Sequence, residues 1–390
     1  MKETKFKDTE IGRIPEEWEE FPLSSLVTDI ADGPFGSNLK TEHYISKKQV
    51  RVVQLSNIGD DGWHDANTKY TSFAHASTLS RCIIPTGSVL IAKMMPAGRA
   101  IICPNIDNSY ILGSDVVRIT CNTKLEPKYF VYSTKSKLYL EQISECTQGS
   151  TRQRTSISKL KNIQIVVPPF QEQCRIASAL TSIDNLISSL GKLIEKKKNI
   201  KQGAMQQLLT GRTRLKGFSE PWVEKKLGEL FEIGNGKDYK NLKSGPIPVF
   251  GTGGLMTYVN EYLYDGETIC IGRKGTIDKP QYHKGKIWTV DTLFYTYRFK
   301  DINVKYLYYL STTINWNEYN TATGVPSLTS QNILKIKVVL PLEEEQQAIA
   351  TILTKMDDEI TALEAKKAKY EAIKQGMMQQ LLTGKIRLIS

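Results

Sequence analysis

Apolar residues recur along two stretches of the chain with the spacing of long helices. In both stretches isoleucine, leucine or methionine returns at alternating intervals of four and three residues. The first stretch carries Ile176, Leu180, Ile183, Ile187, Leu190 and Ile194, and the second carries Ile349, Leu353, Met356, Ile360 and Leu363. A mean interval of 3.5 residues is typical of coiled coils. We therefore predict two long helices that pack through these positions.

The two helical stretches are copies of each other. The run IKQGAMQQLLTG, from Ile200 to Gly211, returns as IKQGMMQQLLTG, from Ile373 to Gly384, and the alignment continues without a gap back to Pro168 and Pro341. We expect the apolar stripe to continue through Ile200, Ala204 and Leu208, and through Ile373, Met377 and Leu381. Each helix would cover roughly 40 residues, about 60 Å, and a helix of this kind needs a partner. Antiparallel pairing of the copies about a pseudo-two-fold axis is the simplest arrangement. Packing of each helix on its own domain or on a second subunit is the alternative.

Each helical stretch follows a globular segment of mixed pattern. Short β-type runs are expected at residues 50–55, 88–92, 116–119, 163–167, 266–271 and 336–340, and helices at 129–143 and 304–316. Trp18, Leu23 and Leu26 recur as Trp222, Leu227 and Leu230. The fold class predicted is α+β, with two mixed domains joined by two long helices in an antiparallel coiled coil. The four segments are a polar arm (to about Glu20) with the first domain at 1–168, the first helix at 169–211, the second domain at 212–341, and the second helix with a tail at 342–390.

The composition is that of a folded, basic protein. Hydrophobic residues make up 40% of the 390 residues and charged residues 24%, which excludes the composition of disordered chains. A net charge of +11 and a pI near 9.1 suit a polyanionic partner such as nucleic acid. No apolar run reaches membrane-spanning length and no targeting segment begins the chain, so we expect a cytoplasmic protein without a membrane partner.

Motifs for catalysis and metal binding are incomplete. The run Val167-Pro168-Pro169-Phe170 is similar to the Asn/Asp-Pro-Pro-Phe/Tyr signature of amino-methyltransferases, but valine cannot replace the amide or carboxylate that holds the target amine. The run Gly234-Asn235-Gly236-Lys237 lacks the third glycine of a dinucleotide loop. Six cysteines form no C-x-x-C pair and four histidines no i, i+4 pair. We predict no catalytic residue, no metal site and no bound cofactor.

Polar loops are the remaining candidates for function, and they occur in pairs. Residues 93–99 and 149–155 in the first domain match residues 272–275 and 324–331 in the second. Arginine and glutamine read guanine and adenine edges, while serine and threonine reach phosphates. The candidate DNA contacts are Lys93, Arg99, Ser150, Arg152, Gln153, Arg154, Lys237, Arg273, Lys274, Ser327 and Thr329. Solvated turns without a ligand are the alternative.

The whole arrangement resembles the specificity (S) subunits of type I restriction-modification systems. The resemblance is carried by Pro-Pro-Phe-Gln-Glu-Gln at 168–173, its partner at 341–346, the twin Gln-Gln-Leu-Leu-Thr-Gly endings, and Leu23-Ser24-Ser25-Leu26 with Leu227-Gly228-Glu229-Leu230. It implies a non-catalytic subunit in which each variable domain, a target-recognition domain, reads half of a split, asymmetric site in double-stranded DNA. The helices would set the half-site spacing and dock two adenine methyltransferase (M) subunits. S-adenosylmethionine, ATP and Mg would be bound by partners, which include restriction (R) subunits.

Three other functions are alternatives, and the sequence fits them to different degrees. The chain is also compatible with the recognition subunit of a related type II restriction-methylation system. A coiled-coil scaffold without DNA specificity would explain the helices but not the paired polar loops. A self-contained restriction-methylation enzyme would need the cofactor and Asn/Asp-Pro-Pro motifs that are missing here.

Overall fold

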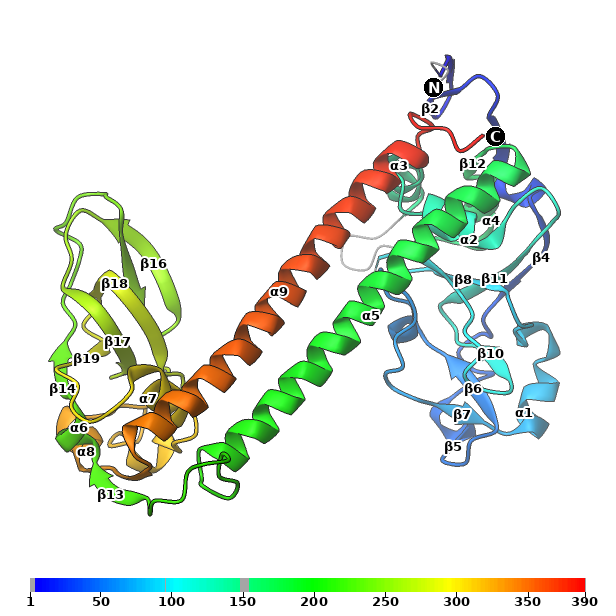
Figure 1. The fold of residues 1–390 in the computed structure, drawn as a ribbon. Helices are drawn as coiled ribbons and strands as arrows, with labels where there is room; N and C mark the ends of the chain where they lie inside the picture. The colour runs from blue at the N-terminus through cyan, green and yellow to red at the C-terminus, as the bar shows by residue number, and fades with distance from the viewer. Residues whose placement is uncertain (1–3, 95, 148–153, 390) are drawn as a thin grey trace. The chain divides into compact units, whose positions relative to one another are not determined.

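The computed structural model describes residues 4–94, 96–147 and 154–389 (Figure 1). Contacts within the chain divide it into two compact units. Unit 1 comprises Met1–Ser189 and Lys367–Ser390, and unit 2 comprises Leu190–Lys366. This division differs from the four sequential segments predicted above, because it cuts both long helices. Each unit therefore contains one globular domain, the beginning of the helix that follows it, and the end of the other helix.

The two long helices are continuous, α5 at Phe170–Leu208 and α9 at Glu343–Leu381, with 39 residues each. Within each unit their segments run antiparallel. In unit 1 the Asp184 carboxylate lies 2.6 Å from the Lys374 ammonium. In unit 2 Lys197 and Lys201 pair with Glu359 and Asp357, at 2.7 and 2.5 Å. Of the positions predicted for the coiled coil, Ile176, Leu180, Ile183, Leu190, Ile194, Ile349, Leu353 and Ile360 are buried, and Ile187, Met356 and Leu363 are half-buried. Four of them are buried in the globular cores, Ile176 and Leu180 in unit 1 and Ile349 and Leu353 in unit 2.

The predicted continuation of the apolar stripe is wrong at its first position. Ile200 and Ile373 are 48% and 39% exposed, whereas Leu208 and Leu381 are buried. The reason is that the end of each helix packs on a globular core instead of on a partner helix. Leu381 belongs to the core of unit 1 and Leu208 to that of unit 2. Ile200 and Ile373 therefore face away from both cores, at equivalent places in the two units.

Residues 6–22 are folded, which corrects the prediction of a polar arm up to about Glu20. Strands β1 (Phe6–Thr9) and β2 (Gly12–Pro15) form a hairpin, and β3 (Glu19–Pro22) pairs antiparallel with β12 (Gln164–Val167). The apolar residues in this polar stretch are the cause, because Ile14 and Trp18 are 2% and 0% exposed in the core of unit 1.

In its described residues, the rest of the first domain contains two four-stranded sheets and four short α-helices. The sheets have the orders β4-β11-β8-β9 and β10-β6-β7-β5. The strands are β4 (Val27–Asp32), β5 (Tyr44–Ile45), β6 (Val50–Val53), β7 (Tyr70–Thr71), β8 (Val89–Ala92), β9 (Ala100–Ile102), β10 (Tyr110–Leu112) and β11 (Val116–Cys121). The helices are α1 (Phe73–Thr78), α2 (Pro127–Ser133), α3 (Lys137–Cys146) and α4 (Ile157–Asn162). The helix predicted at 129–143 is thus two helices, since Ser136 caps α3 by accepting a hydrogen bond from the Tyr139 N–H.

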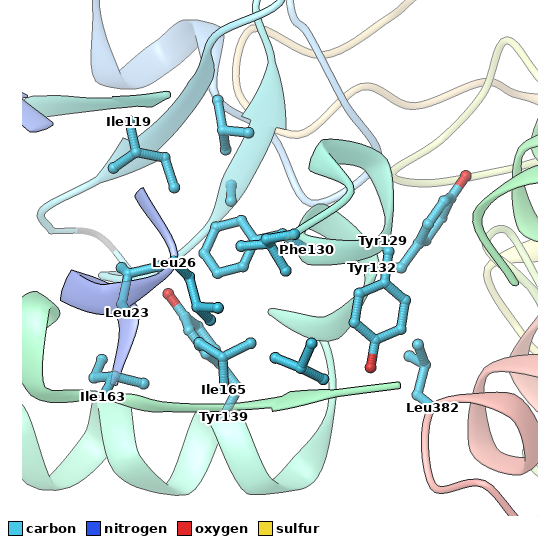
Figure 2. Close-up of a cluster of buried hydrophobic side chains, with 14 of the residues drawn as sticks. Leu23, Leu26, Ile119, Tyr129, Phe130, Tyr132, Tyr139, Ile163, Ile165 and Leu382 are labelled. Atoms are coloured by element: carbon cyan, nitrogen blue, oxygen red, sulfur yellow. The ribbon is translucent and has the colours of Figure 1, made fainter. Parts of the chain in front are cut away.

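One apolar core joins this domain to the helices (Figure 2). Phe130 and Tyr132 of α2, Ile165 of β12 and Leu23 converge on it, and Leu382 approaches from just beyond the end of α9. The last helical residues of the chain therefore complete the core of the first domain.

The second domain has a single six-stranded sheet in the order β14-β19-β17-β18-β15-β16. The strands of this sheet are β14 (Glu232–Asn235), β15 (Ile247–Gly251), β16 (Gly254–Val259), β17 (Tyr264–Gly272), β18 (Gln281–Thr289) and β19 (Leu293–Tyr297). Strands β13 (Val223–Lys226) and β20 (Lys337–Leu340) pair separately as a two-stranded sheet. Its helices are α6 (Leu227–Leu230), α7 (Val304–Ser311) and α8 (Ser330–Lys335). The helix predicted at 304–316 ends at Ser311 and is followed by a 3-10 turn at Trp316–Tyr319.

The two domains share a strand arrangement that their sequences hide. In the first domain β11 lies between β4 and β8, and in the second β19 lies between β14 and β17. A parallel pair adjoins each group, β6 with β10 and β15 with the end of β18. The two domains are therefore built on one scaffold.

The repeated junction motifs connect each domain to its helices. In unit 1 Glu172 accepts hydrogen bonds from Trp18 Nε1 (3.1 Å) and from Nε and Nη2 of Arg387 (2.8 Å each). The equivalent set in unit 2 is Glu345 with Trp222 Nε1 (3.3 Å) and Arg214 (2.8 and 2.7 Å). The glutamine that follows is also used twice, since Gln173 bonds Pro168 and Glu126 while Gln346 bonds Pro341 and Asn303.

A second repeated cluster lies further along each helix pair. The Tyr132 hydroxyl donates to Asp184 (2.8 Å), which also binds Lys374. In unit 2 the Tyr309 hydroxyl donates to Asp357 (2.7 Å), which binds Lys201. Burial raises the pKa of both phenols well above the usual range, so both remain hydrogen-bond donors. Each cluster links the domain, the helix that follows it and the end of the other helix.

Candidate nucleic-acid interface

The described ends of the two candidate loops of the first domain, Lys93 with Met94 and Arg154 with Thr155, lie side by side. Met94 and Arg154 form an isolated antiparallel bridge, and the Thr155 N–H donates to the Lys93 carbonyl at 2.9 Å. Arg154 projects from this bridge with 53% of its side chain exposed, and its guanidinium lies 2.7 Å from the Asp115 carboxylate. The loops that the sequence marked separately thus form one surface.

The second domain repeats this bridge with other residues. Lys274 and Ser327 pair as Met94 and Arg154 do, and the Leu328 N–H donates to the Arg273 carbonyl at 2.9 Å. Arg273 and Lys274 are both exposed. Because Lys274 replaces Met94 and Ser327 replaces Arg154, one backbone arrangement presents a different set of polar groups in each domain.

Strand ends and two close backbone approaches position these loops. Lys93 follows β8 and its N–H donates to the Asp115 carbonyl, while Arg273 follows β17 and donates to Thr292, at 2.9 and 2.8 Å. A third loop joins each surface through a glycine. A Cβ at Gly33 would collide with the Gly113 carbonyl, and one at Gly236 would collide with Val290. Only glycine permits these two close contacts. The contact of Gly33 places the loop after it beside the bridge of the first domain, and the contact of Gly236 places Lys237 beside the bridge of the second.

The individual candidates differ in accessibility. Lys93 is only 4% exposed and its ammonium binds the Asp32 carboxylate, so we leave it out of the proposed contacts. Arg99 is half-buried, with Nε 3.3 Å from the Pro96 carbonyl. Ser150, Arg152 and Gln153 lie outside the described residues.

Three candidates in the second domain remain. Lys237 is exposed, and its backbone N–H donates to Thr289 at 2.8 Å. Ser327 is half-buried. Thr329 is exposed and caps α8 by accepting from the Asn332 N–H at 3.2 Å. Thr329 therefore already has a local structural role.

A polar pocket beside Arg154 was missed by sequence reasoning. It has a volume of about 280 Å³ and is lined by Tyr44, Gln54, Leu55, Ser56, Gly113, Ser114 and Asp115. Amide, hydroxyl and carboxylate groups are those that pair with base edges. The lining residues come from three separate segments and follow no short motif, so no local signal marks them.

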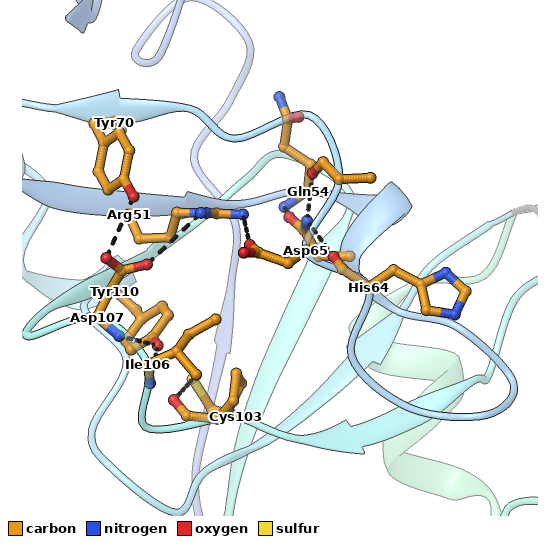
Figure 3. A network of polar contacts seen from close by, with 12 residues as sticks. Arg51, Gln54, His64, Asp65, Tyr70, Cys103, Ile106, Asp107 and Tyr110 are labelled. Atoms are coloured by element: carbon orange, nitrogen blue, oxygen red, sulfur yellow. Dashed lines mark hydrogen bonds and ion pairs between the residues drawn. The ribbon is translucent and has the colours of Figure 1, made fainter. Parts of the chain in front are cut away.

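A buried arginine holds the strand that leads to this pocket (Figure 3). Arg51 on β6 is 1% exposed, and its guanidinium lies 2.7 Å from Asp65 and 3.6 Å from Asp107. Three residues later the Gln54 N–H donates to the Asn57 side chain at 2.8 Å, and Asn57 in turn holds the backbone of His64 at 2.9 Å. Paired in this way, the buried charge fixes the loop that places Gln54.

Titratable groups outside this surface show no arrangement for catalysis in the described part of the chain. Burial raises the pKa of the Cys103 and Cys121 thiols to about 12, so neither is a thiolate at neutral pH. Among the described residues no three His, Cys, Asp or Glu side chains come together as a metal site. None of the described helices has the length and apolar character needed to cross a membrane.

One scaffold is used twice in this chain, with different polar loops at equivalent places in the two domains. The chain belongs to the type I restriction-modification DNA specificity family, whose domain model matches residues 15–201 and 219–375. It is accordingly a specificity subunit, the non-catalytic part of a type I restriction-modification enzyme.

Relatives cover the whole chain. The putative type I restriction enzyme MjaX specificity subunit of Methanocaldococcus jannaschii is 28% identical, over 99% of this chain and 98% of that relative. The MjaVIII specificity subunit of the same organism is 26% identical over 99% and 97%. The crystal structure of a type I S subunit from M. genitalium has a TM-score of 0.65 at 19% identity and covers 93% of this chain and 96% of that one, which shows a shared fold.

Proposed function

We propose that each domain reads one half of a bipartite, asymmetric site in double-stranded DNA. The observation that carries this proposal is the repeated loop bridge, Met94 with Arg154 and Lys274 with Ser327. Equivalent backbones with different side chains are what two readers of unlike half-sites require. Arg154 and Arg273 are the residues suited to base edges, and Lys237 and Lys274 to phosphates.

The helices would set the separation of the two half-sites. A continuous helix of 39 residues is about 58 Å long, and half-sites one turn of B-DNA apart are separated by about 34–36 Å. Such a helix is long enough to act as a spacer between two readers. The paired segments and their buried seam supply the stiffness that a spacer needs.

Two methyltransferase subunits would dock on equivalent surfaces, one in each unit. Ile200 and Ile373 occupy equivalent positions in the two helical copies and are both exposed, as a contact with an apolar partner surface requires. In this proposal the partners bind S-adenosylmethionine and methylate adenine. Restriction subunits that use ATP and Mg complete the complex, so the chain needs no cofactor of its own.

Sequencing of modified bases in a host with and without this gene tests the proposal. We expect one bipartite motif with a methylated adenine in each half, present only with the gene. A gene carrying Arg273→Ala should change the preference in one half alone. Methylation that stays the same after deletion of the gene would refute the proposal.

A further inference from the structure

Phe35 is the most exposed large apolar side chain of the described residues, with 84% of its surface accessible. It begins a turn closed by the hydrogen bond from the Asn38 N–H to its own carbonyl, at 2.8 Å. The turn lies between β4 and β5, directly after buried Pro34. Isolated apolar residues are common on protein surfaces, so exposure alone assigns no role.

The loop that carries Phe35 is held at both ends. Before it, the Gly33 N–H donates to the Val116 carbonyl at 3.0 Å, next to the close approach to Gly113. After it, the Asn38 carbonyl bonds His75 Nε2 at 2.9 Å, and the Lys40 N–H donates to His43 Nδ1 at 3.0 Å. The imidazoles of His43 and His75 stack with centroids 4.0 Å apart. The ring is therefore presented on a preorganised turn, which lowers the entropy lost on binding.

Phe35 also belongs to the candidate DNA surface. Its Cα lies within about 7 Å of Gly33 along the chain. Gly33 packs against Gly113 and Ser114, which line the polar pocket beside Arg154. An aromatic ring, a base-reading arginine and a pocket of amide and hydroxyl groups thus lie on one part of the domain.

The surroundings of Phe35 favour a nucleobase over a protein as its partner. Gly36, Ser37, Asn38 and Lys40 are polar or small and lie at the surface. The Gly33 backbone packs on Gly113 and Ser114, next to the pocket residue Asp115, which pairs with Arg154. Cores of protein interfaces gather several apolar residues and are depleted of charge. An exposed aromatic ring among amide, hydroxyl and basic side chains is typical of surfaces that stack bases and hold phosphates.

We infer that Phe35 inserts between two bases of the half-site read by the first domain, as an apolar wedge in duplex DNA. This inference rests on the proposed function and names one of its specificity-determining residues. A wedge requires partial unstacking, which is easiest at pyrimidine–purine steps. The first half-site should therefore prefer such a step where Phe35 enters.

The second domain lacks this device at the matching turn. Tyr239 begins that turn, closed by the Leu242 N–H at 2.9 Å, but its ring packs against the small core of Val249, Val259, Trp288 and Val290. The wedge should consequently act on one half-site only, and this asymmetry is part of the test.

The experiment measures binding of the full chain, assembled with its methyltransferase, to DNA duplexes. These duplexes contain the motif that sequencing of modified bases identifies. We expect Phe35→Ala to weaken binding about 5- to 150-fold, the range for loss of one stacked aromatic, and Phe35→Trp to retain most affinity. Phe170→Ala is the matched control, since Phe170 is 44% exposed in the same unit at the start of α5. 2-Aminopurine at each step of the half-site should brighten at one position with the wild type and not with Phe35→Ala.

Scrambling the half-sites separates the possible outcomes. When the first half-site is scrambled, Phe35→Ala should cause no further loss of DNA affinity. When the second half-site is scrambled, the loss of affinity from Phe35→Ala should add in full. Two results for Phe35→Ala would overturn the inference and leave the proposed function standing. One is an unchanged affinity for DNA, and the other is a normal affinity for DNA combined with a loss of assembly with the methyltransferase. A wild-type protein that binds scrambled and native duplexes equally would overturn both.

Discussion

Replacing Arg387 by methionine should destabilise unit 1, because it leaves the buried Glu172 carboxylate without its cationic partner. Glu172 is 2% exposed and accepts four hydrogen bonds, two from Arg387 at 2.8 Å, one from Trp18 Nε1 and one from the Leu388 N–H, both at 3.1 Å. Methionine retains most of the apolar stem of arginine but removes both charged bonds to Glu172, together with the bond of Arg387 to the exposed Glu17. Breaking one partner of a buried ion pair costs about 3–5 kcal/mol. Since two N–H donors remain, we expect a loss near the lower end, about 3 kcal/mol.

A second substitution tests whether the unpaired charge of Glu172 causes the loss of stability. Glu172→Gln removes the charge and retains the shape, but its single oxygen can accept from only one of Trp18 Nε1 and the Leu388 N–H. Removing the unpaired charge should outweigh the lost hydrogen bond, so the double variant Glu172→Gln with Arg387→Met should be more stable than Arg387→Met alone. A double-mutant cycle in urea, followed by tryptophan fluorescence, gives the coupling. Trp18 is a suitable probe because it is fully buried and the Arg387 guanidinium lies 5.6 Å from its ring centroid.

The equivalent pair in unit 2 is the matched control. Arg214 binds Glu345 in the same geometry, but its side chain is 27% exposed, against 9% for Arg387. Arg214→Met should therefore cause a smaller loss, because water reaches the site. A loss below about 1 kcal/mol for Arg387→Met, or a double variant less stable than the single one, would refute the reasoning.

The remaining predictions concern pH, base reading and spacing. Burial against Phe250 lowers the pKa of His283 to about 4. In the unfolded chain the pKa of this imidazole is about 6.5, so as the pH falls the unfolded state binds the proton first. Stability of the second domain should then fall by at most about 3 kcal/mol as pH drops from 6.5 to 4, and His283→Gln should abolish this slope in urea titrations. Arg154→Ala and Arg273→Ala should each cost about 1–3 kcal/mol and relax one half-site if they read base edges; a uniform loss over all sequences would make them phosphate contacts. Deleting one heptad from α5 shortens the helix by about 10 Å, so the native site should be lost; full affinity for it would contradict the spacer.

The sequence predicted the parts of the fold that depend on periodicity. The heptad positions are buried or half-buried, and strands lie at every run that was marked. Errors arose where tertiary contacts override local pattern. Residues 6–22 look polar, yet Trp18 draws them into a core completed by Leu382, which comes from the opposite end of the sequence. No window of sequence contains that contact.

The candidate surface was predictable only as loops. The bridges of Met94 with Arg154 and Lys274 with Ser327 unite segments that are far apart in the sequence, which paired polarity suggested but could not place. Lys93 shows the limit of residue type as a guide. A lysine in a polar loop reads as a surface cation, but its ammonium is bound internally by Asp32. The pocket of Gln54 and Ser114 escaped because only the folded backbone brings its lining together.

The repeated contacts between domain and helices explain how one scaffold can carry two different sets of loops. Glu172 with Arg387 corresponds to Glu345 with Arg214, and Asp184 with Lys374 corresponds to Asp357 with Lys201, in the same alignment that relates the two helices. These bonds are made by the long helices and the segments that flank them, not by the loops that differ. The loops leave the far ends of β8 and β17, whose apolar residues belong to the buried cores. Substitutions in a loop therefore alter the groups at the proposed DNA surface without altering how a domain is held on its helices.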